Sequence, residues 1–136
     1  MKKSLSLLLA LSICALDVGA AAAQSGPRAN GPLRRVGQCA ATRITEIGYR
    51  LQDENGRPIR DSGSFFGTAN GLGGVTYSRV AAVHRSRIGD RVRVCLISIP
   101  RGCPPGDDRG REYRTTNLRT RQSWVMPDSQ HGCGGA

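Results

Sequence analysis

The chain has 136 residues, with 20 Lys and Arg against 10 Asp and Glu and a formal net charge of +10. This length fits one small domain and excludes a large multidomain enzyme. The basic surplus favours anionic partners over cationic ones, and the longest apolar stretch, residues 5–16, is too short to span a bilayer as a helix.

The first 23 residues have the pattern of a secretory signal peptide. Lys2 and Lys3 give a basic start, the apolar stretch follows, and small residues precede Gln24. We therefore expect cleavage before Gln24 and a periplasmic or secreted mature protein with no transmembrane segment. Every basic side chain after Lys3 is an arginine.

Residues 24–38 are rich in Gly, Pro and Arg and poor in apolar side chains. This composition predicts a disordered basic tether. The expected domain organisation is thus a signal peptide at 1–23, a tether at 24–38 and one small β domain at 39–136.

Four cysteines remain after the signal peptide, which contains Cys14; they are Cys39, Cys95, Cys103 and Cys133. An even number in an exported chain predicts two disulfides, for which three pairings are possible. A Cys95–Cys103 bridge would need a chain reversal near Ile99, where no turn residue occurs. We therefore favour Cys39–Cys95 and Cys103–Cys133.

The first half of the domain predicts strands joined by glycine-rich turns. Residues 42–52 alternate between apolar and polar side chains, which is typical of a half-buried strand. Residues 62–69 and 75–77 form shorter segments separated by the turn at 70–74. These two segments predict a hairpin.

The second half contains the strongest strand signal. Val80 and Val83 are three residues apart, so residues 79–87 predict at most one short helical turn over the end of the domain. Residues 91–99 carry apolar side chains on both faces, which indicates a central strand. Residues 112–117 and 122–126 predict a last hairpin. The predicted fold is all-β: a disulfide-stabilised small barrel or sandwich of about six or seven short antiparallel strands.

Several segments also resemble a group of small bacterial secreted proteins. They are residues 86–90, 95–100, 103–110, 117–120 and 124–136. The similarity is clear over about the last 50 residues. It implies a compact exported domain and transfers no functional residue.

The most informative candidate site is the arginine-rich region from residue 79 to residue 121. It contains 11 arginines against four acidic residues. Arginines two apart on a strand share a face, and an aromatic ring among them could stack a base while the arginines bind phosphates. The candidate binding residues are Arg91, Arg93, Arg111, Tyr113, Arg114, Arg119 and Arg121.

Catalytic candidates are fewer. His131, His84 and Glu112 could supply an acid or base, but no spacing requires that they assemble. No metal or cofactor is expected, since the cysteines are expected to be oxidised. We therefore expect a non-enzymatic exported module that binds an anionic envelope component or an acidic partner. The alternative is a small secreted, nuclease-like hydrolase of an anionic polymer.

Overall fold

The computed structural model describes residues 32–135. The expected signal peptide at 1–23 and residues 24–31 of the expected tether lie outside the described residues. The elements are β1 (Cys39–Gln52), β2 (Pro58–Thr68), β3 (Gly73–Thr76), α1 (Ala81–Arg85), β4 (Arg91–Ser98), β5 (Glu112–Asn117) and β6 (Ser123–Pro127).

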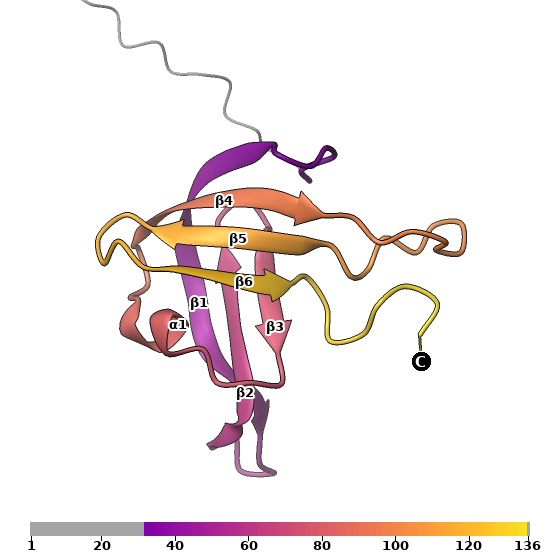
Figure 1. Cartoon of the computed structure of the whole chain (residues 1–136). Helices are drawn as coiled ribbons and strands as arrows, with labels where there is room; N and C mark the ends of the chain where they lie inside the picture. The colour runs from indigo at the N-terminus through magenta and orange to yellow at the C-terminus, as the bar shows by residue number, and fades with distance from the viewer. Residues whose placement is uncertain (1–31, 136) are drawn as a thin grey trace, which may run out of the picture.

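The six strands form an antiparallel arrangement in the order β3-β2-β1-β4-β5-β6. The long strand β1 belongs to two layers: its first part pairs with β4, and its second part pairs with β2. Figure 1 shows β4, β5 and β6 running across the strands of the other layer. The predicted all-β fold is confirmed, and it is sandwich-like rather than a closed barrel.

The strand β4 lies between β1 and β5 and alternates between buried and exposed side chains. Val92, Val94 and Leu96 are fully buried, whereas Arg91 and Arg93 between them are exposed. Because successive side chains on a strand point to opposite faces, the valines and the leucine enter the core while the arginines line the outside. This strand was the clearest sequence prediction, and it is confirmed.

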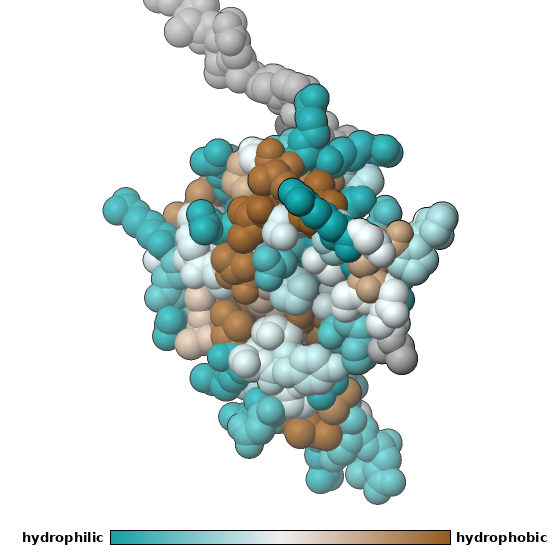
Figure 2. Space-filling model, turned by 45° about the vertical axis from the view of Figure 1, so that its right-hand side comes forward, coloured by the Kyte–Doolittle hydropathy of each residue, from teal (hydrophilic) through white to brown (hydrophobic). Residues whose placement is uncertain are grey.

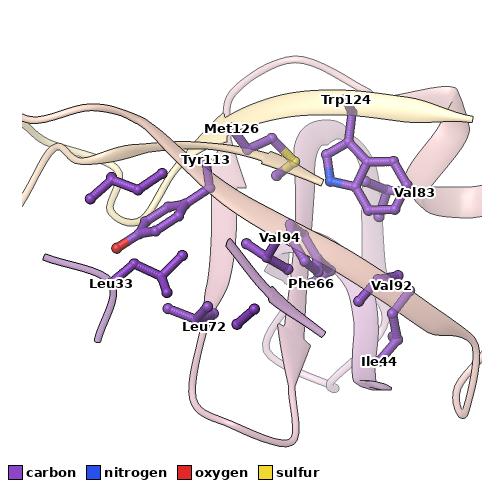
Figure 3. Packing of buried hydrophobic residues seen from close by; sticks show 12 residues of the cluster. Leu33, Ile44, Phe66, Leu72, Val83, Val92, Val94, Tyr113, Trp124 and Met126 are labelled. Atoms are coloured by element: carbon purple, nitrogen blue, oxygen red, sulfur yellow. The ribbon is translucent and has the colours of Figure 1, made fainter. Parts of the chain in front are cut away.

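The core fills the space between the two layers (Figure 3). Phe66 from β2 meets Trp124 from β6 edge to face, with ring centroids 5.3 Å apart. This geometry is favourable for aromatic pairs. Gly74 of β3 packs against Met126 of β6, and a Cβ at position 74 would lie 2.8 Å from the Met126 Cβ. The two outer strands therefore approach each other closely because one of them carries a glycine there.

Described residues before Cys39, the expected start of the domain, also pack on the sandwich. Leu33 is fully buried in the core. The Gly37 amide donates to the Leu96 carbonyl at 2.8 Å, and the Leu96 amide donates to the Gln38 carbonyl at 2.9 Å. One apolar side chain and a short extension of the β1–β4 pairing thus hold residues 33–38 on the sandwich, where composition alone predicted a tether.

Both favoured disulfides are present. Cys39–Cys95 joins directly opposite positions of β1 and β4. Cys103–Cys133 joins the loop after β4 to the segment after β6. The first bridge therefore reinforces two neighbouring strands, whereas the second fixes two segments that lie outside the strands.

The expected helical turn is α1, and its Val83 is fully buried in the core. It covers one end of the sandwich (Figure 1). Within residues 32–135, no helix has the length and apolar character needed to cross a membrane.

The β1–β2 hairpin extends beyond the body of the molecule (Figure 1). Its register partners Leu51 and Ile59 are each 42% exposed, and Figure 2 shows a hydrophobic area on this projection. Residues 60–63 of β2 lie opposite Arg50 alone, so three extra residues of β2 interrupt the pairing just before the body. The Ser62 hydroxyl fills the gap, since it accepts from the Leu51 amide at 2.9 Å and donates to the Ile59 carbonyl at 2.6 Å.

Candidate functional site

Four exposed arginines share the outer surface of β1, β4 and β5. We call this surface the arginine face; its members are Arg43, Arg91, Arg93 and Arg114. Arg43 is the register partner of Arg91. Arg93 follows two residues after Arg91, and Arg114 is opposite Cys95, two residues further along β4. The strand geometry therefore places all four side chains on one side of the sheet.

The arginine face is not neutralised by neighbouring carboxylates. The ion pairs within residues 32–135 join Arg109 to Asp107, Arg111 to Asp108 and Arg119 to Asp90. None of them involves the arginine face. Like charges directly opposite each other on a sheet are destabilising, so the Arg43–Arg91 pair carries a cost that no acidic partner in this region offsets.

Hydroxyl groups lie beside the charges. Thr116 of β5 is the register partner of both Arg93 and Ser123. Its hydroxyl is hydrogen-bonded to that of Ser123 at 2.8 Å. A surface of guanidinium and hydroxyl groups offers several donors to phosphate, sulfate or carboxylate oxygens.

Four of the seven sequence-predicted binding residues lie away from this face, and Tyr113 and Arg111 are the first two. Tyr113 is only 4% exposed and packs in the core. Burial and the nearby charge of Asp128 raise the pKa of its hydroxyl, while Arg111 acts in the opposite direction. Arg111 is paired with Asp108 at 3.1 Å. Together these side chains line one end of a cavity of about 480 Å³ between the layers.

Arg119 stabilises the fold through its contacts with Asp90. Its Nε and Nη2 donate to the two oxygens of Asp90 at 2.7 and 2.8 Å. The buried Asn117 donates its Nδ2 to the same carboxylate at 2.8 Å. Hydrogen bonds from the Arg119 side chain, then from Asn117 and the Arg87 amide, hold the pKa of Asp90 well below its ordinary value despite its burial. This network ties the turn before β4 to the turn after β5.

Arg121 lies in the β5–β6 turn, where its φ of 58° places it in the left-handed region. Its amide donates to the Asn117 carbonyl at 2.8 Å. Of the seven predicted binding residues, the structure therefore brings together Arg91, Arg93 and Arg114 and adds Arg43.

The catalytic candidates occupy separate places. His84 on α1 stacks on Tyr49, with ring centroids 4.4 Å apart. Its Nε2 lies 2.8 Å from the Ser64 hydroxyl. That hydroxyl also accepts from the Val80 amide at 2.9 Å, so it joins β2 both to His84 and to the residue before α1. Burial lowers the pKa of His84, and the charge of Arg79 lowers it further.

The Ser64–His84 pair has the hydrogen bond of a nucleophile and its base. Ser64 is fully buried, however, so a substrate has no access to its hydroxyl in this conformation. The pair instead fixes α1 to β2. Glu112 lies at the start of β5, on the same face of that strand as Arg114, while His131 lies after β6.

His131 belongs to a cluster that sequence reasoning missed. The Arg50 guanidinium lies 4.3 Å from the centroid of the Tyr77 ring, and the His131 ring lies 6.4 Å from the same ring. In the sequence, a tyrosine next to a turn, Tyr77, was the available signal for this cluster. Its partners Arg50 and His131 are distant from it in the sequence. No group of three or more His, Cys, Asp or Glu residues suited to a metal occurs within residues 32–135.

The fold and this geometry define a disulfide-linked, sandwich-like β domain with an unneutralised arginine face. Comparison of the chain with protein-family models, curated proteins and solved structures finds no match.

Proposed function

We propose that this protein is an exported, non-enzymatic module that binds an anionic polymer of the cell envelope through the arginine face. The observation that carries the proposal is the Arg43–Arg91 pair, two like charges opposite each other with no ion pair to a described carboxylate. A bound anion would remove the repulsion and gain charge-assisted hydrogen bonds.

The spacing of the arginines supports a polymer rather than a single small anion. Arg91 and Arg93 are two residues apart on an extended strand, which separates them by about 7 Å. Arg114 continues the positive surface onto the next strand. A chain with repeated anionic groups can contact several of these positions at once.

Export is supported by two kinds of observation. The first 23 residues have the pattern of a signal peptide. Both disulfides link parts of the described chain, and disulfides persist mainly in oxidising compartments outside the cytoplasm. A periplasmic or secreted location brings the arginine face into contact with anionic surface polymers.

The proposal is tested by salt-dependent binding to heparin, used as a model polyanion. Arg91→Thr/Arg93→Thr should weaken binding and flatten its dependence on salt, because fewer counterions are released. Arg57→Thr/Arg60→Thr is the matched control, since it removes the same charge from the exposed hairpin. Equal losses in the two variants would mean that binding follows net charge, and the arginine face would be rejected.

The hydrolase alternative has less support, because the catalytic candidates His84, His131 and Glu112 are on separate elements and Ser64 is buried. Incubation of the purified protein with RNA, DNA and an acidic glycan checks it. Degradation that His131→Ala abolishes would favour the enzyme over the binding module.

A further inference from the structure

A second exposed site lies on the β1–β2–β3 part of the fold, away from the arginine face. Tyr77 follows β3 and is 54% exposed. The Arg50 guanidinium covers one face of its ring, 4.3 Å from the centroid. Because Arg50 covers only one face, this exposed fraction leaves other parts of the tyrosine open to solvent.

The covering arginine is itself held in place. Its Nε donates to the Ser62 carbonyl at 2.6 Å, and its Nη1 donates to the Gln130 side-chain oxygen at 2.8 Å. The His131 ring approaches Tyr77 edge to face, with an interplanar angle of 68°. Arg50 and His131 contact the ring, and Arg50 is itself held by hydrogen bonds. These contacts fix the orientation of Tyr77 before a ligand binds, which lowers the entropic cost of binding.

The charges around the ring select the kind of ligand. A cation on one face draws π-electron density toward itself, so the opposite face favours an uncharged flat ring over a second cation. Arg50 has no ion pair with a carboxylate of residues 32–135. The surroundings therefore also favour a ligand that carries negative charge.

We propose that Tyr77, with Arg50 and His131, is a stacking site for one base of a single-stranded nucleic acid. A nucleotide provides both a flat, uncharged ring and an adjacent phosphate. Stacking on an exposed aromatic side chain is how proteins hold single strands without reading their sequence. The site is on a different part of the fold from the arginine face, so it does not depend on the proposed function.

The test compares two labelled strands of equal length, an oligothymidylate and an abasic strand with the same phosphates. The unaltered protein should bind the oligothymidylate about five-fold or more tightly than the abasic strand. Tyr77→Leu should abolish this preference and leave binding of the abasic strand and of heparin unchanged. Tyr77→Phe, which keeps the ring, should retain the preference.

The fluorescence of the buried Trp124 confirms that each variant is folded. Equal affinity of the unaltered protein for the two strands would overturn the stacking site while leaving polyanion binding intact. An equal loss of both strands and of heparin in Tyr77→Leu would also overturn it, because the tyrosine would then act through the fold. Binding of heparin with no binding of the oligothymidylate would reject a nucleic acid as the ligand.

Discussion

Arg43 and Arg91 are directly opposite each other on β1 and β4, and no ion pair within residues 32–135 involves either side chain. A sheet gains stability from opposite charges or apolar contacts at such a position and loses it from like charges. Sites where a sequence departs from the locally stable choice are expected to be functional. The arginine face should therefore show opposite effects of mutation on stability and on binding.

The first prediction concerns Arg91→Thr. Threonine suits an exposed strand position, and its introduction removes the repulsion with Arg43. We expect the free energy of unfolding to rise by about 0.2–1 kcal/mol while heparin binding weakens. Urea unfolding at low ionic strength, followed by Trp124 fluorescence, measures the gain.

Arg101→Thr is the control for this prediction, because Arg101 is exposed in the loop after β4 and has no cross-strand partner. The gain from Arg91→Thr should shrink as salt screens the repulsion. A variant that is less stable than the unaltered protein at low salt would contradict the argument.

The second prediction concerns the buried carboxylate of Asp90. Breaking a buried ion pair leaves donors unpartnered and costs several kcal/mol, but the Arg119 side chain is 42% exposed, which reduces the effect. We expect Asp90→Asn to lower the free energy of unfolding by about 2–3 kcal/mol at neutral pH. Chemical denaturation measures this loss.

The pH dependence of the same variant has a defined sign. The pKa of Asp90 lies below its ordinary value of 3.8 in the folded protein. Its stabilising effect is therefore present above about 3.8 and is lost as the pH falls through the folded pKa. Asp90→Asn should lose less stability on acidification than the unaltered protein. Asp61→Asn, on the exposed hairpin, is the control and should keep the original acid dependence.

The third prediction concerns His84, whose pKa is lowered in the folded protein from 6.5. The unfolded chain binds more protons between the two pKa values. The free energy of unfolding should therefore fall as the pH decreases from about 6.5 through the folded pKa. Thermal unfolding measured across this range checks the slope.

His84→Phe keeps a ring on Tyr49 but removes the His84 partner of the buried Ser64 hydroxyl. We expect a loss of about 1–2 kcal/mol at neutral pH and a flatter profile below it. His131→Ala should retain the slope of the unaltered protein. A slope that survives His84→Phe would assign the titration to another group.

Much of the fold follows from local patterns. Apolar side chains on both faces of residues 91–99 indicated a central strand, which is β4, and Val80 with Val83 indicated the turn that became α1. Local patterns did not decide between a barrel and a sandwich. That choice depends on how β3 and β6 meet at Gly74 and Met126. That contact joins residues far apart in the sequence.

The candidate site was only partly predictable. The period of two that grouped Arg91 with Arg93 also separates Tyr113 from Arg114, so an exposed role for both was inconsistent with a single strand. The pairing of Arg119 with Asp90 joins residues 29 positions apart, with no local signal. Local alternation therefore predicts which strand positions share a face, whereas ion pairs depend on tertiary packing.

The last prediction is the disulfide pattern, which trypsin can resolve without reduction because an arginine separates each pair of neighbouring cysteines. Cys39 falls in residues 36–43 and Cys95 in residues 94–101, and these two peptides should be recovered linked. The second linked pair should be residues 102–109 and 122–136. A peptide joining residues 94–101 to 102–109 would contradict the register of β1 with β4, because Cys39 and Cys95 are direct partners there.

Since each bridge closes a loop of tens of residues, its loss should lower the free energy of unfolding by about 3–4 kcal/mol in the chain-entropy model. Chemical denaturation of the Cys103→Ser/Cys133→Ser variant measures this loss for the second bridge.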